Sequence, residues 1–101
     1  MKKPGMSNVR RAIHLGSIPS LAPRVRLRED RARRCKVVLG PERVLIPDPI
    51  ASSVLARCDG ARSVAAIAID LAAEHRAPPD VVERDVVSLL QRLSDDGWIK
   101  A

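Results

Sequence analysis

The spacing of apolar residues changes once along this chain, and that change limits the possible folds more than any other feature. Before Pro47, apolar and polar residues alternate, as in Arg24-Val-Arg-Leu-Arg28, which is the period of a half-buried strand. After Pro47, apolar residues recur at the three- and four-residue spacing of amphipathic helices. The sequence therefore predicts an α+β domain, winged-helix-like, with a three-stranded antiparallel sheet followed by three helices.

The strands are predicted at residues 24–28, 35–39 and 43–46, with a polar loop at residues 29–34. Gly40-Pro41-Glu42 predicts a tight turn, because Gly accepts unusual backbone angles and Pro fixes its own. The second and third strands are therefore expected to be antiparallel neighbours. Pro47 lacks an N–H group and ends the third strand.

Each predicted helix has its own start signal. Asp48-Pro49 starts the first helix and Ser63 caps the second. Asp80 is expected to cap the third helix, with Glu83 at the capping-box spacing. Gly60 and Gly97 suit the left-handed backbone that follows a helix. The predicted buried faces are Ile50, Val54, Leu55 and Cys58; then Val64, Ile67, Ala68, Leu71 and Ala72; then Val82, Val86, Leu89, Leu90 and Leu93.

The net charge of +6 is unevenly distributed. Residues 1–34 carry ten Lys or Arg against two acidic residues, whereas residues 35–101 carry eight basic and ten acidic residues. Residues 80–96, the predicted third helix, have a net charge of −3. Phosphate contacts dominate affinity for DNA, so an acidic helix is poorly suited to enter its major groove. A DNA-binding winged-helix regulator is kept as the alternative function.

The first twenty residues are rich in Pro, Gly and basic side chains, which predicts a flexible basic tail at residues 1–20 and a folded domain at residues 21–101. No run of about 18 apolar residues exists to span a membrane, and Arg10, Arg11 and His14 interrupt any secretory signal. We expect a cytoplasmic protein, monomer or homodimer, with reduced cysteines.

The sequence contains no recognisable catalytic or metal-binding grouping. His14 and His75 share no ligand spacing with each other, with Cys35 or with Cys58, so we expect no enzyme activity, no metal and no cofactor. A small enzyme using Cys58 for electrophilic or redox chemistry is the third possibility. Phe and Tyr are absent, which disfavours a platform for single-stranded nucleic acid.

A binding module remains, and the predicted third strand is its candidate site. If residues 43–46 lie at the edge of the sheet, their unpaired backbone groups can accept an extended peptide as an added strand. The opposing interpretation is an edge that Arg43 and Pro47 protect against unwanted pairing.

Residues 19–100 resemble the PqqD family of pyrroloquinoline quinone (PQQ) biosynthesis, through the order and spacing of several short motifs. These are Pro19-x-Leu21-x-Pro23-x-Val25-Arg26-Leu27-Arg28-x-Asp30, Leu39-Gly40-Pro41-Glu42-Arg43, the stretch from Ile50 to Cys58-Asp59-Gly60-x-Arg62-Ser63-Val64, Ile67-x-x-x-Leu71-Ala72, Val82-x-x-Asp85-Val86-x-x-Leu89-Leu90-x-x-Leu93 and Gly97-Trp98-Ile99.

The resemblance implies a non-catalytic peptide chaperone that binds the precursor peptide PqqA and presents it to the radical S-adenosylmethionine (SAM) enzyme PqqE. It also implies leader-peptide recognition by strand addition between the third strand and the third helix. The contact set carried over is Arg43, Val44, Leu45, Ile46, Val82, Asp85, Val86, Leu89 and Leu90. One helical stripe cannot serve both core and peptide throughout, so we expect Val86, Leu90 and Leu93 to be core, and Asp85 and Leu89 to lie nearer the peptide.

The chain departs from the family pattern at two places. Pro47-Asp48 stands where the family often has Leu-Asn, which removes one possible N–H donor from the edge and puts the peptide register there in doubt. Ala66 stands where many members have Glu, so the capping box after Ser63 is lost.

Overall fold

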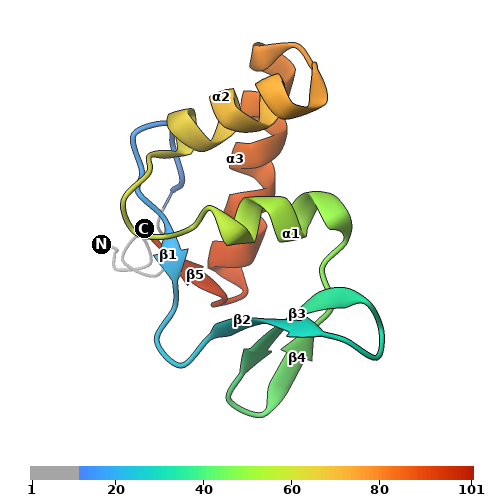
Figure 1. Cartoon of the computed structure of the whole chain (residues 1–101). Coiled ribbons are helices and arrows are strands. Elements are labelled where there is room, and N and C mark those ends of the chain that lie inside the picture. Colours follow the sequence, from blue (N-terminus) through green and yellow to red (C-terminus); the bar gives the residue numbers. More distant parts are fainter. Residues whose placement is uncertain (1–11) are drawn as a thin grey trace, which may run out of the picture.

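The computed structural model describes residues 12–101 and contains a three-stranded sheet, a helical layer and a second, very small sheet (Figure 1). The elements in chain order are β1 (Ser20–Leu21), β2 (Arg26–Asp30), β3 (Cys35–Gly40), β4 (Arg43–Leu45), α1 (Pro49–Ala56), α2 (Val64–His75), α3 (Pro79–Asp95) and β5 (Ile99–Lys100). The predicted α+β class, a three-stranded antiparallel sheet followed by three helices, is confirmed.

The main sheet has the order β2-β3-β4 with both pairs antiparallel. The register aligns Leu27 with Val38 and Val38 with Leu45, so three apolar side chains share the face that packs on the core. β2 begins two residues later than predicted, because Arg24 has a φ of 67° and the Val25 N–H donates to the Ala22 carbonyl at 3.0 Å. Those two features form a turn before the strand.

Two of the three predicted helix caps are confirmed. The Asp48 carboxylate accepts the Ala51 N–H at 2.8 Å, and the Ser63 hydroxyl accepts the Ala66 N–H at 3.1 Å. The prediction for Asp80 is wrong: α3 begins at Pro79, its N-cap is Pro78, and no side chain caps it. Pro79 is suited to the first helical position, so Asp80 lies inside the first turn. There the negative charge of Asp80 interacts favourably with the helix dipole.

The predicted faces of the helices are largely confirmed, with one error. The buried stripe of α1 is Ala51, Val54 and Leu55, followed by Cys58 after the helix. Ile50 falls beside that stripe and is 62% exposed. Gly60 has the expected positive φ of 76°, but α1 has already ended at Arg57 in a right-handed conformation.

Residues 12–20 pack on the domain, which differs from the tail expected over residues 1–20; residues 1–11 lie outside the described part of the chain. Ile13 is buried in the core. The carbonyls of Ser17 and Leu15 accept the N–H groups of Val64 and Ala65 at 2.8 and 3.0 Å, at the start of α2. The segment therefore satisfies donors that a helix start leaves unpaired.

The chain end also returns to this segment. β5 pairs antiparallel with β1, Ser20 opposite Lys100 and Leu21 opposite Ile99. No alternating pattern predicts this sheet, because each strand has only two residues.

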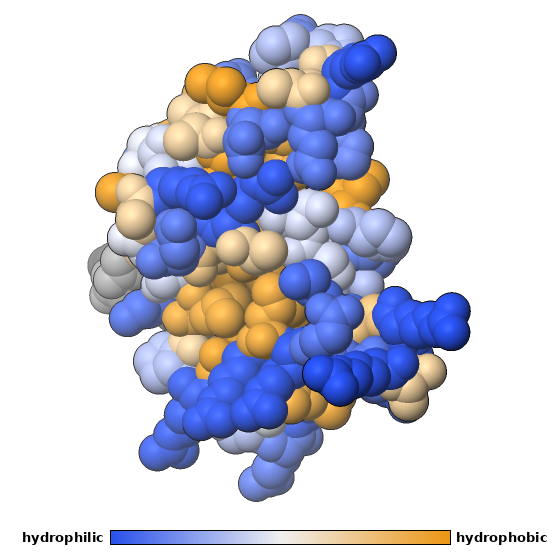
Figure 2. Space-filling view, in the orientation of Figure 1, coloured by the Kyte–Doolittle hydropathy of each residue, from blue (hydrophilic) through white to orange (hydrophobic). Residues whose placement is uncertain are grey.

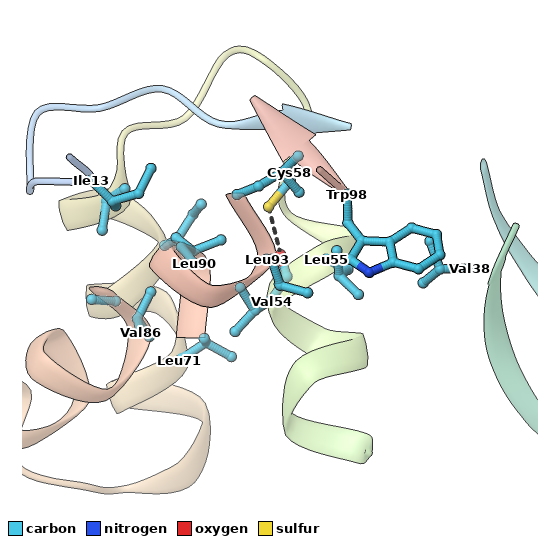
Figure 3. Close-up of a cluster of buried hydrophobic side chains, with 14 of the residues drawn as sticks. Ile13, Val38, Val54, Leu55, Cys58, Leu71, Val86, Leu90, Leu93 and Trp98 are labelled. Atoms are coloured by element: carbon cyan, nitrogen blue, oxygen red, sulfur yellow. Dashed lines mark hydrogen bonds between the residues drawn. The ribbon is translucent and has the colours of Figure 1, made fainter. Parts of the chain in front are cut away.

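The core is aliphatic apart from Cys58 and Trp98, the only aromatic residue. Leu55, Ile67 and Leu90 are among its fully buried side chains. The Trp98 indole points from the helical side toward Val38 of β3 (Figure 3). Trp98 therefore joins the sheet to the helices.

Candidate functional site

β4 forms one edge of the main sheet: its neighbour on one side is β3, and no strand of residues 12–101 pairs with its other side. Gly40 and Arg43 are opposite each other across the turn at Pro41-Glu42, which places the Arg43 N–H against the Gly40 carbonyl. Because antiparallel pairs alternate between bonded and non-bonded, we infer that Val44 and Ile46 direct their backbone groups outward. The open edge, defined as residues 43–46, can therefore pair with another strand.

The side chains at the open edge are unusually apolar for an exposed strand. Val44 is 58% exposed and Ile46 is 53% exposed. On the face of the molecule shown in Figure 2, an apolar surface lies above the mostly hydrophilic side chains at the foot of the view, where the main sheet lies. An edge with exposed aliphatic side chains offers both backbone hydrogen bonds and apolar contacts to an added strand.

The helix α3 divides its predicted contact residues into two groups. Val86 and Leu90 are buried, Leu90 at 0% exposed, and with Leu93 they belong to the core as the sequence predicts. Val82 and Leu89 are half-buried and pack against that core, whereas Asp85 is exposed. Only the second group presents atoms to the surface, so the peptide contacts carried over to Val86 and Leu90 would require α3 to move.

The open edge meets α3 at the C-terminal end of the helix. The Arg43 Nη1 donates to the Asp96 carbonyl at 2.7 Å, and the guanidinium lies 3.9 Å from the centroid of the Trp98 ring. Arg43 is therefore occupied within the domain. No local sequence pattern predicts this contact with Trp98, although the glycines at 40 and 97 are a signal of close packing around it.

Both glycines lie where a side chain would be crowded. A Cβ at Gly40 would lie 3.1 Å from Trp98 Cζ3, and a Cβ at Gly97 would lie 3.1 Å from Arg43 Nη2. Gly97 also has a φ of 82°, which L-residues with side chains rarely adopt.

A cluster of charges joins α1 to α2 away from the open edge. Arg57 donates from Nε to Asp70 at 2.7 Å and from Nη2 to Glu74 at 2.8 Å. The hydrogen bond and charge of Arg57 lower the pKa of the Asp70 carboxyl, and the same contacts raise the pKa of Arg57. Exposed pairs of this kind contribute modestly to stability and belong to the scaffold.

Cys58 does not have the properties of a reactive thiol. It is buried, its Sγ lies 3.3 Å from the Val54 carbonyl, and burial, with the nearby Asp59 charge, raises the pKa of the thiol to about 12. A thiolate nucleophile needs a lowered pKa and solvent access. Among residues 12–101, no group of three His, Cys, Asp or Glu side chains is arranged to hold a metal ion. In the same part of the chain, no helix combines the length and apolar character needed to cross a bilayer.

Comparison with known proteins adds to this geometry. Residues 35–99 match the family model "Coenzyme PQQ synthesis protein D (PqqD)". A "PqqA binding protein" of Rhodopseudomonas palustris strain BisB5 is 47% identical over 83 residues, covering 82% of this chain and 81% of that protein. A protein of the same name from Xanthomonas euvesicatoria is 51% identical over 77 residues, covering 76% and 84%.

Two solved structures are similar. One is the solution structure of the PqqD part of Methylobacterium extorquens PqqCD, described as a recognition element for ribosomally synthesized and post-translationally modified peptides. It has a TM-score of 0.76 and 33% identity, covering 89% of this chain and 96% of that one. The other is the crystal structure of PqqD from Xanthomonas campestris, with a TM-score of 0.52 and 45% identity, covering 83% and 93%.

Proposed function

The chain belongs to the PqqD family, and from that premise we propose that it is a non-catalytic peptide chaperone of PQQ biosynthesis. It binds the precursor peptide PqqA and presents it to the radical SAM enzyme PqqE. The names of the relatives and the description of the M. extorquens structure support the peptide part of this proposal. The presentation to PqqE rests on the family resemblance alone.

The observation that carries the proposal is the open edge. Residues 43–46 have a backbone without a strand partner among the described residues, and Val44 and Ile46 expose aliphatic side chains beside it. A peptide that adds as a strand pairs with the outward backbone groups of Val44 and Ile46. Such binding is independent of stacking on aromatic rings, which suits a chain whose only aromatic residue is buried.

The helix supplies the second wall of the site. Val82, Asp85 and Leu89 are the predicted contact residues of α3 that reach the surface, and we assign the side-chain contacts with the peptide to them. Val86 and Leu90 support that wall from the core. No proton transfer or covalent step is assigned to this chain, and the chemistry belongs to the enzyme that receives the peptide. We place this encounter in the cytoplasm, where a ribosomally made peptide is first available.

The test is a titration of ¹⁵N-labelled protein with synthetic PqqA, followed by amide chemical shifts. We expect the largest shifts at residues 43–47 and along the exposed side of α3 between residues 82 and 89, with little change in α2. A peptide of the same composition in scrambled order is the control, and it should leave the spectrum unchanged. Shifts that avoid both segments would show that the proposed site is wrong.

Addition of PqqE to the saturated complex tests the presentation step separately. Further broadening or shifting of amide signals in the presence of both partners would support a ternary complex. If PqqE causes no change in the protein–peptide spectrum, peptide binding can stand while presentation fails.

A further inference from the structure

Arg43 makes two attractive contacts that fasten β4 to the end of α3. Its guanidinium stacks 3.9 Å from the centre of the Trp98 ring, a cation–π geometry. Its Nη1 also donates to the carbonyl of Asp96, the C-cap of α3, at 2.7 Å. Carbonyls at a helix C-terminus lack partners within the helix, and the helix dipole favours a cation there.

The two partners of Arg43 are held firmly, whereas the strand that carries it is short. Trp98 is 6% exposed, and its backbone is fixed by hydrogen bonds from its N–H to the Leu93 carbonyl and from the Ala22 N–H to its own carbonyl. β4 has three residues and a neighbouring strand on only one side among the described residues. Short edge strands with few buried contacts open easily.

The close packing around this contact leaves little freedom in its geometry. A Cβ at Gly40 would press on the indole, and a Cβ at Gly97 would press on the guanidinium, both at 3.1 Å. The hairpin, the indole and the end of α3 are therefore closely packed around Arg43.

We propose that Arg43 is a positioning residue: its contacts with Trp98 and Asp96 hold the open edge at the distance from α3 that an added peptide strand requires. The inference rests on the proposed function for its peptide part. Arg43 then has a different role from Val44 and Ile46. The guanidinium of Arg43 contacts other residues of the domain, whereas the backbone groups of Val44 and Ile46 pair with the peptide.

The first test needs no peptide. Hydrogen exchange of the amides of β4 should become about tenfold faster in Arg43→Ala, because the strand loses its attachment to α3, while α2 amides keep their rates. Arg28→Ala, which removes an equal charge from the exposed β2, is the matched control and should leave β4 unchanged. Unchanged exchange in β4 of Arg43→Ala would overturn the inference. If Arg43→Ala fails to fold, Arg43→Lys, which keeps the charge but loses the planar stacking, serves in its place.

The second test measures the affinity for PqqA by calorimetry. We expect Arg43→Ala to weaken binding about fivefold to tenfold, Arg43→Lys to fall between, and Arg28→Ala to match the unmodified protein. If the unmodified protein binds PqqA and Arg43→Ala binds it with equal affinity, the positioning role is overturned and the proposed function stays intact. If the unmodified protein does not bind PqqA, the proposed function and the peptide part of the inference are overturned. The hydrogen-exchange experiment still decides whether Arg43 holds β4.

Discussion

The main sheet has two free edges within the described chain, and they differ in chemistry. The β2 edge carries exposed charged side chains at Arg26, Arg28 and Glu29, and Leu27 packs against the core. The β4 edge carries Val44 and Ile46, both more than half exposed. Exposed charges along an edge strand discourage pairing with other chains, and aliphatic side chains do not. One sheet therefore has an edge protected against pairing and an edge that permits it.

The two edges also differ in what lies beside them. Arg43 of β4 contacts the C-terminal end of α3, so a strand added there would meet a helix as well as a sheet. β2 leads into the turn at residues 31–34, whose side chains are all exposed. The two edges therefore differ through the side chains and elements around them, since both have the backbone of an edge strand.

The largest expected effect comes from removing an outward N–H at the open edge. Ile46→Pro should weaken PqqA binding about tenfold or more, because it removes a backbone donor and places a ring where the added strand would lie. Ile46 is 53% exposed and follows β4, so the fold should tolerate the change. Calorimetry gives the affinity, and thermal unfolding checks that the domain is intact.

Ile46→Ala is the matched control, since it shortens the side chain and keeps the N–H. It should bind more tightly than Ile46→Pro, with the difference reporting the backbone contribution. Equal affinities of the two variants for PqqA would mean that the peptide forms no backbone hydrogen bonds with the open edge. The difference between the two edges would then not explain peptide binding.

The next prediction converts the protected edge into a permissive one. Arg26→Val combined with Arg28→Val should produce weak self-association, with a Kd of about 0.1–1 mM, because residues 26–28 of the variant strand are then apolar on both faces. Sedimentation velocity at increasing protein concentration measures it. The control is Arg31→Val combined with Arg33→Val, which removes the same charge from the turn. Self-association of both variants alike would show that net charge, rather than the edge, keeps the chains apart.

The sequence allowed the strands, two of the three caps and the core stripes of α2 and α3 to be predicted, because each depends on neighbouring residues. The Asp48 and Ser63 caps are examples, since a cap and its N–H partner are three residues apart. The N-cap position of α3 was predicted at Asp80 but lies at Pro78. Pro79 suits the first helical position, so the helix begins before the side-chain signal of Asp80.

The contacts that were missed join residues far apart in the chain. Ile13 donates its N–H to the Gln91 side chain, and β1 pairs with β5, so residues 12–20 belong to the domain. The contact between Arg43 and Asp96 is of the same kind. For the candidate site, local patterns and the family resemblance located the strand and the helix, but only the tertiary structure shows which side chains are exposed and which, like Leu90, are buried.

The smallest expected effect is that of salt on peptide binding, and it distinguishes the two edges without any mutation. If PqqA pairs with the open edge through backbone groups and aliphatic side chains, raising NaCl from about 50 to about 500 mM should change its Kd by less than about threefold, because screening acts on charges. The arginines at 26, 28, 31 and 33 are exposed and would respond strongly to salt if they held the ligand. A steep loss of affinity would therefore move the binding surface to the β2 side of the sheet. The same titration with a DNA duplex addresses the alternative function, for which affinity at low salt and its steep loss with added salt are the signature.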